Sequence, residues 1–160
     1  MIKDFDEKTH LAGVRACVIE LQDFERSLDG RMPSGAEIVD AYIPQMLERC
    51  AECDGIILVA EIDGDVAGFA TILARVKSDE IEDGDIEYGL ISDLIVAREF
   101  RERGIGKMLM KAAESYAITS GVKWLRIGVL AKNYAAEHLY DSLGFEKLYI
   151  EREKELSLTD

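Results

Sequence analysis

Residues 91–107 read ISDLIVAREFRERGIGK and join an apolar strand pattern to an amphipathic helix pattern through a loop with two glycines. Glycines at such a junction let a ligand approach the backbone closely, and the first N–H groups of the helix stay free to bind an anion. Arg98, Arg101, Arg103 and Lys107 make the loop basic in a chain whose net charge is −13. The loop therefore predicts a phosphate-binding site.

The segments around this loop predict one sheet with helices packed on its faces. Hydrophobic periodicity and turn residues give the order β-α-α-β-β-β-α-β-α-β, with an antiparallel hairpin around Asp63-Gly64. We expect a mixed α/β or α+β domain with a mostly antiparallel sheet. Pro44 should kink the second helix or break it in two. The predicted strands are 2–5, 56–62, 66–73, 90–96, 124–130 and 145–150, and the predicted helices are 7–24, 34–53, 105–120 and 133–143.

Length and composition favour one domain over residues 1–160. The net charge of −13 opposes nucleic acids and anionic membranes and suits cationic small molecules, although it also simply keeps a protein in solution. Cys50 and Cys53 form a C-x-x-C pair without further ligands at matching spacing, so we expect no metal. No apolar run could span a bilayer and the acidic N-terminus is unlike a secretory signal, so we expect a cytoplasmic protein.

Two common nucleotide fingerprints do not fit the glycine loop. A dinucleotide-binding fingerprint requires a third glycine where Leu109 stands. A nucleotide P-loop requires glycine at Arg101 and serine or threonine at Met108. What remains is Arg-x-x-Gly-x-Gly between a strand and a helix.

This pattern resembles the acetyl-CoA-binding motif of the GNAT superfamily of N-acetyltransferases. Residues 133–145, Asn-x-x-Ala-x-x-Leu-Tyr-x-x-x-Gly-Phe, resemble the second motif of that family at the expected distance. The resemblance implies a GNAT-like acyl-CoA N-acyltransferase fold. It also implies that main-chain groups of the loop and of the preceding strand hold coenzyme A. The implied cofactor-binding residues are Leu94, Ile95, Val96, Arg101, Arg103, Gly104, Ile105, Gly106, Lys107 and Asn133.

The same resemblance suggests catalytic groups. Tyr140 matches the family tyrosine that protonates the departing thiolate, with a core tyrosine as the alternative. A backbone N–H near Leu94 would polarise the thioester carbonyl. Asp93 and Glu87 are the candidates for the base that takes a proton from the amine, directly or through water. The substrate side should come from residues 20–42, where Arg31 could bind a carboxylate or pair with a neighbouring aspartate.

The resemblance implies an acetyl-CoA-dependent N-acetyltransferase that moves the acetyl group directly to an amine in a ternary complex. The acceptor is a small molecule, and a protein amine stays open. A homodimer is also open, because many relatives are dimers and an exposed last strand could pair across an interface. The rival interpretation is a non-catalytic acyl-CoA-binding sensor or interaction module on the same fold.

Overall fold

A tight hairpin forms the centre of the sheet. The computed structural model describes residues 1–157, and in it Asp63 and Gly64 turn β2 (Gly55–Ile62) into β3 (Asp65–Lys77). Both turn residues have positive φ, 52° and 92°, as in the two-residue turns that match the twist of antiparallel strands. The predicted hairpin is confirmed, and β3 continues beyond its predicted end.

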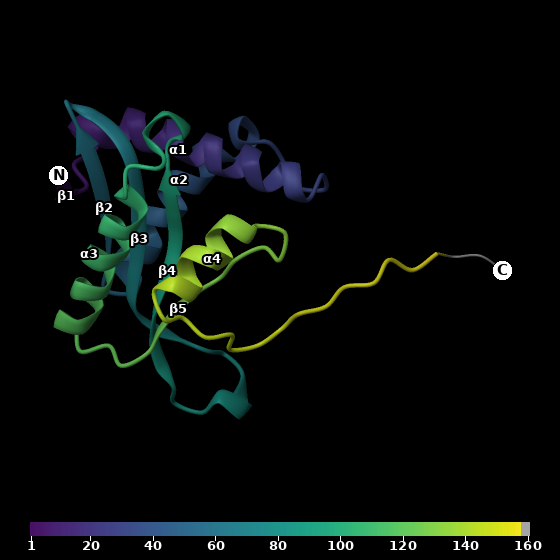
Figure 1. Cartoon of the computed structure of the whole chain (residues 1–160). Coiled ribbons are helices and arrows are strands. Elements are labelled where there is room, and N and C mark those ends of the chain that lie inside the picture. Colours follow the sequence, from purple (N-terminus) through teal and green to yellow (C-terminus); the bar gives the residue numbers. More distant parts are fainter. Residues whose placement is uncertain (158–160) are drawn as a thin grey trace.

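Five strands form one sheet in the order β1-β2-β3-β4-β5 (Figure 1). The pairs β1·β2, β2·β3 and β3·β4 are antiparallel, and β5 runs parallel to β4. The predicted mixed, mostly antiparallel sheet is therefore confirmed. The other three strands are β1 (Ile2–Asp4), β4 (Glu87–Val96) and β5 (Leu125–Ile127).

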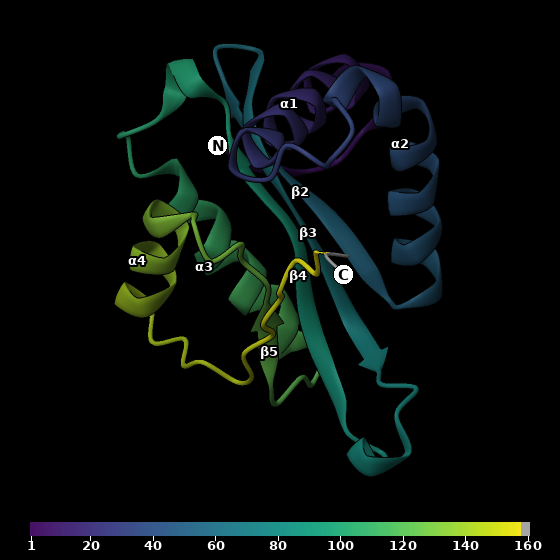
Figure 2. The same cartoon turned by 90° about the vertical axis from the view of Figure 1, so that its right-hand side faces the viewer.

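Two pairs of helices cover the two faces of the sheet (Figure 2). Fully buried Phe69 belongs to the core under the first pair, and Ile72 and Leu109 belong to the core under α3. Within residues 1–157, no helix has the length and apolar character that crossing a membrane requires. The first pair is α1 (Glu7–Leu28) and α2 (Gly35–Glu52), and the second pair is α3 (Ile105–Thr119) and α4 (Tyr134–Ser142). Two short 3-10 helices lie outside these pairs, η1 (Ile81–Asp83) and η2 (Arg98–Phe100).

The turn between α1 and α2 is fixed by caps and by close backbone contact. Ser34 and Glu37 form a capping box at the start of α2. A Cβ at Gly35 would lie 2.4 Å from the backbone of Ile19, so only glycine lets the two helices approach this closely. Of the two outcomes predicted at Pro44, a kink or a break, the break is wrong: α2 continues through this exposed residue, because buried side chains on either side of it hold the helix against the sheet.

The predicted last strand is also wrong. Residues 145–157 form neither helix nor strand, and in Figure 1 they run away from the sheet, although Glu153 contacts Arg31 at the turn between α1 and α2. Gly144 ends α4 with a φ of 85° and directs the chain outward. β5 has three residues instead of the predicted seven, so the sheet offers a very short edge to a sixth strand.

Candidate active site

The sheet opens between β4 and β5. Only Gly89–Ile91 of β4 pairs with β5, so among the described residues the second half of β4 has no strand beside it on that edge. On the opposite edge, the Ala97 N–H donates to the Ala67 carbonyl of β3 at 2.9 Å. The open edge is therefore a place where a ligand can pair with main-chain groups.

The direction of the β4 backbone shows which groups face this opening. Successive N–H groups of a strand point to opposite edges. Since the Ala97 N–H points to β3, those of Leu94 and Val96 point to the open edge, and that of Ile95 points to β3. Of the three strand residues predicted to bind coenzyme A, Leu94 and Val96 present main-chain donors to the opening and Ile95 does not.

A β-bulge turns a carboxylate toward α1 and α2. Adjacent residues of β3 pair with Ile91 and Asp93, so Ser92 is an extra residue in β4. The extra residue reverses the alternation of side chains. Ile91 consequently packs in the core under α3, while Ile95 packs in the core under α1 and α2 and Asp93 reaches α2.

Asp93 is buried and fully engaged by hydroxyl groups. Its side chain is 4% exposed. The Tyr42 hydroxyl of α2 donates to Asp93 Oδ1, and the Ser92 hydroxyl donates to Oδ2 at 2.9 Å. Burial and the Asp93 charge raise the pKa of Tyr42, so the phenol keeps its proton. Asp93 thus lies at the open part of β4 with a proton-bearing hydroxyl at its side.

The N-terminus of α3 lies beside the same opening. Gly104 precedes the helix with a φ of 76°, a left-handed conformation that favours glycine. The Met108 N–H is the first to bond back along the helix, to the Gly104 carbonyl at 3.1 Å. The N–H groups of Ile105, Gly106 and Lys107 therefore have no acceptor within α3 and are available to an anion.

This N-terminal turn lies between β4 and α4. A Cβ at Gly106 would lie 3.7 Å from Leu139 of α4 and 3.8 Å from Val96 of β4. Exposed Arg103 and Lys107 add positive charge around it. The predicted glycine loop and the predicted strand residues are thereby brought together.

Glu20 of α1 ties the basic loop to the rest of the site. The Arg101 guanidinium donates to the Val96 carbonyl at 2.9 Å and to Glu20 Oε1 at 2.7 Å. The same carboxylate oxygen accepts the Arg98 N–H at 2.9 Å. Arg101 therefore spans from α1 to the open edge of β4.

The second motif forms α4. Asn133 caps the helix by accepting the Ala136 N–H at 3.2 Å. Two turns later, Tyr140 is half-buried, with its ring centroid 6.0 Å from that of Phe145. Burial and the nearby charge of Glu25 raise the pKa of Tyr140 to about 12. Within residues 1–157 its hydroxyl makes no hydrogen bond, so it is free to act on a ligand.

Glu25 was not predicted from the sequence, although a signal for it exists. It is half-buried, and burial and the Asp93 charge raise its pKa. Its position continues a stripe of apolar residues spaced by three and four along α1. An acid within such a stripe faces the interior, and this irregularity could have identified it. The apolar members of the stripe are Val14, Val18, Leu21 and Leu28.

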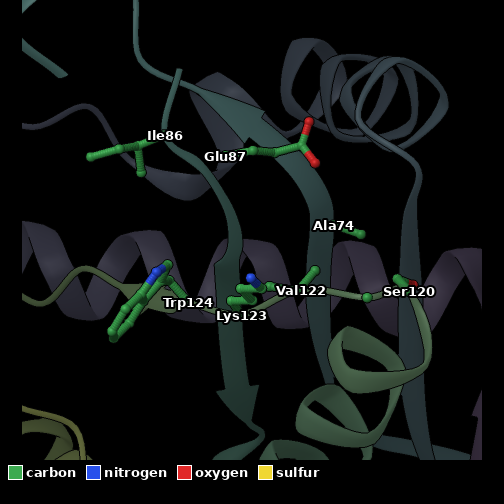
Figure 3. A pocket seen from close by; sticks show the side chains of 8 residues that line it. Ala74, Ile86, Glu87, Ser120, Val122, Lys123 and Trp124 are labelled. Carbon is green, nitrogen blue, oxygen red and sulfur yellow. The ribbon is translucent and has the colours of Figure 1, made fainter. Parts of the chain in front are cut away.

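The structure separates the two predicted base candidates. Glu87 begins β4, about 20 Å along the strand from Asp93 at 3.3 Å per residue. Its carboxylate accepts from Arg75 at 3.2 Å. It lines a cavity of about 270 Å³ together with Lys123 and Trp124 (Figure 3), remote from the glycine loop. Asp93 is the candidate that lies at the open part of β4, where it accepts the Tyr42 hydroxyl.

Arg31 adopts one of its two predicted roles. It donates to both carboxylate oxygens of Asp29, at 2.8 and 2.5 Å, and to Glu153 of the C-terminal segment at 2.7 and 2.9 Å. The hydrogen bonds from Arg31 to Asp29 lower the pKa of Asp29 to about 2. Arg31 is therefore paired with the protein's own acids at the turn between α1 and α2.

A sheet that opens beside a helix N-terminus with free N–H groups offers a place where a phosphate-bearing ligand can bind. The sequence profile of the acetyltransferase (GNAT) family matches residues 21–145. The chain belongs to this family and is an acetyl-CoA-dependent N-acetyltransferase, an enzyme that moves an acyl group from acyl-CoA to an amine.

Individual relatives agree with this assignment. Over 111 residues the chain is 35% identical to an uncharacterized N-acetyltransferase of Archaeoglobus fulgidus, covering 65% of this chain and 67% of that protein. It is 29% identical over 111 residues to mycothiol acetyltransferase of Nocardiopsis dassonvillei, covering 69% of this chain but 33% of that protein. The chain thus spans about two thirds of the first relative and one third of the second.

Solved structures share the fold. A single-site mutant of the BH1408 protein from Bacillus halodurans superposes with a TM-score of 0.79 at 17% identity, over 98% of this chain and 99% of that one. Aminoglycoside N-acetyltransferase AAC(6')-Iy in complex with CoA superposes with a TM-score of 0.64 at 22% identity, over 96% and 99%. At these identities the likeness shows the fold alone.

Proposed function

We propose that the protein transfers the acetyl group of acetyl-CoA directly to the amine of a cationic small molecule within a ternary complex. The observation that supports this most is the placement of buried Asp93 at the open part of β4, with half-buried Tyr140 on α4. Acyl transfer to an amine requires a proton acceptor for the nitrogen and a proton donor for the leaving thiolate. The amine of a protein is the alternative acceptor.

The glycine loop fits the pyrophosphate of coenzyme A. Free N–H groups begin α3, and a Cβ at Gly104 would have no atom within 4 Å, so a phosphate can approach the backbone. The Val96 N–H suits an amide carbonyl of the pantetheine arm, and the Leu94 N–H suits the thioester carbonyl. Asn133 lies at the N-terminus of α4 on the same side of the sheet. The loop residues inferred to hold the pyrophosphate are Arg101, Arg103, Gly104, Ile105, Gly106 and Lys107.

Asp93 and Tyr140 divide the proton transfers. The bound thioester supplies the acetyl carbonyl and the thiolate leaving group. Asp93 accepts a proton from the amine nitrogen, directly or through the Tyr42 hydroxyl that donates to it. Tyr140 holds its proton at neutral pH, because burial and Glu25 raise its pKa to about 12, and passes it to the sulfur. The ammonium nitrogen gives one proton to Asp93 before attack and a second as the amide forms, and this second proton restores the Tyr140 hydroxyl after it has protonated the sulfur. Asp93 then loses its proton to water, so each turnover releases one proton.

Binding and turnover together test this function. Acetyl-CoA binding is measured by calorimetry, and thiol release is followed with a panel of primary amines. We expect micromolar binding, turnover with at least one amine, and strong loss of turnover in Tyr140→Phe. Tyr134→Phe, on an exposed tyrosine of the same helix, is the matched control. Acetyl-CoA binding without turnover on any amine would instead support the non-catalytic sensor.

One domain over residues 1–160, a cytoplasmic location and a homodimer stay predictions. For the homodimer, residues 145–150 were expected to be able to pair across an interface if exposed, and Leu148, Tyr149 and Ile150 are 63%, 78% and 67% exposed. Sedimentation of the full chain before and after truncation at Gly144 would show whether this segment joins two copies.

A further inference from the structure

The connection between β4 and α3 joins the two parts of the inferred cofactor site. It begins at Ala97, directly after the open edge of β4, and ends at Gly104, directly before the free N–H groups of α3. A ligand that binds both parts gains affinity only if their separation matches its own length. The position of this connection therefore decides how well one molecule can reach both parts.

One carboxylate oxygen of α1 holds the connection. Glu20 Oε1 accepts the Arg98 N–H at 2.9 Å and the Arg101 guanidinium at 2.7 Å. The same guanidinium donates to the Val96 carbonyl at 2.9 Å. Arg98 begins η2, and no side chain of that segment caps it, so Glu20 supplies the acceptor from another helix.

Close packing does not hold the connection on this side. A cavity of about 300 Å³ is lined by residues of α1, β3 and the connection, among them Glu20, Ala97 and Glu99. The Glu20 and Arg101 side chains are 35% and 44% exposed, so water screens their ion pair and its contribution to stability is small. An acid within a basic loop also opposes the binding of anions. Stability alone therefore does not account for Glu20, whereas the geometry of the connection does.

We propose that Glu20 is a positioning residue for coenzyme A: it holds the connection so that the open edge of β4 and the N-terminus of α3 bind one ligand together. This inference rests on the proposed function, in which the open edge takes the pantetheine arm and the N-terminus takes the pyrophosphate. Each part strengthens the other only while the separation between them is fixed. Glu20 acts through the connection and not on the thioester or the amine, so its loss should affect donor binding and not acyl transfer.

Whole and truncated donors test the inference. Calorimetry measures coenzyme A binding by the wild-type chain, Glu20→Ala and Glu20→Gln, and thermal unfolding shows that each is folded. Thiol release gives kcat and KM with acetyl-CoA and kcat/KM with S-acetylpantetheine, which lacks the pyrophosphate. Inorganic pyrophosphate is measured as a competitor of acetyl-CoA. Glu48→Ala is the control, since Glu48 is an exposed acid on α2 with no side-chain partner within residues 1–157.

We expect Glu20→Ala to weaken coenzyme A binding about tenfold, a loss of about 1.4 kcal/mol, and to raise the KM for acetyl-CoA equally. The kcat, the amine KM, the kcat/KM for S-acetylpantetheine and the inhibition constant of pyrophosphate should stay within about twofold of wild type, because each depends on one part alone. Glu20→Gln should be intermediate, since its amide oxygen can still accept the Arg98 N–H while the charge that binds Arg101 is gone. Glu48→Ala should match the wild type throughout.

Three results would overturn the inference. The first is coenzyme A binding by Glu20→Ala that equals or exceeds that of the wild type. The second is an equal loss for pyrophosphate or for S-acetylpantetheine, because Glu20 would then shape one part alone. The third is pyrophosphate that does not compete with acetyl-CoA in the wild type. Absence of coenzyme A binding by the wild-type chain would instead overturn the proposed function.

Discussion

Replacing Tyr140 by phenylalanine removes one oxygen atom and isolates its chemical role. The Tyr140 hydroxyl makes no hydrogen bond within residues 1–157, and its ring packs beside Phe145 and the core under α3. Deleting the hydroxyl therefore leaves no buried group without its partner. We expect the free energy of unfolding to change by less than about 0.5 kcal/mol, which for a domain of this size shifts the Tm by less than about 2 °C.

The expected effect on turnover is much larger. A positioned general acid contributes roughly 10²–10⁴-fold to rate, and a loss of 10² corresponds to about 2.7 kcal/mol of barrier. Because burial and Glu25 raise the pKa of Tyr140 to about 12, the wild-type phenol stays protonated from pH 6 to 9. The ratio of wild-type to variant kcat should therefore stay constant over that range.

The assay is thiol release under saturating acetyl-CoA, with calorimetry and thermal unfolding on the same preparations. Tyr134→Phe should match the wild type in all three measurements. A kcat for Tyr140→Phe within about threefold of wild type would refute the assignment of Tyr140 as the acid. A fall in kcat accompanied by an equal weakening of coenzyme A binding would show that the hydroxyl serves binding instead.

Three further predictions concern the carboxylates and the glycine loop. Asp93→Asn should lower kcat/KM at least about a hundredfold, because the amide cannot take the amine proton, and an unchanged kcat/KM would exclude Asp93 as the base. Gly104→Ala should lower the free energy of unfolding by about 1 kcal/mol and the Tm by about 2–4 °C, because φ is 76° at this residue. Gly128→Ala is the control and should not lower the Tm, because Gly128 has no positive φ and no atom lies within 4 Å of its Cβ position. Burial and the Asp93 charge raise the pKa of Glu25 in the folded protein. Folding therefore favours the protonated form of Glu25, and the wild-type protein loses free energy of unfolding as the pH rises through the folded-state pKa. Glu25→Gln should therefore be more stable than wild type at pH 7 and no more stable at pH 4 by chemical denaturation, and equal differences at both pH values would contradict this.

Local sequence patterns predicted the parts of the fold that depend on local chemistry. Asp63-Gly64 predicts its turn because both residues tolerate positive φ. Asn133 predicts the start of α4 because its side chain satisfies a free N–H group. The glycine loop was located correctly for the same reason, since the free N–H groups of α3 follow from the helix start alone.

Features that depend on distant partners were missed. Nothing in the sequence indicates that Ser92 is an extra residue, because a bulge exists only in the register between β3 and β4. The apolar run Leu148–Ile150 predicts a strand, but a strand forms only where an edge accepts it, and β5 offers three residues. Glu25 was missed because its effect on Tyr140 depends on how α1 and α4 come together in the fold.

The central claim is that the opening beside α3 binds acetyl-CoA, and thermal unfolding with acetyl-CoA, ATP and NAD at equal concentrations tests it most directly. Ligand at about 100 times its Kd adds roughly 2.7 kcal/mol to stability, which should raise the Tm by roughly 5–10 °C. The account predicts that rise with acetyl-CoA alone. No rise with acetyl-CoA, or a larger rise with ATP or NAD, would contradict it.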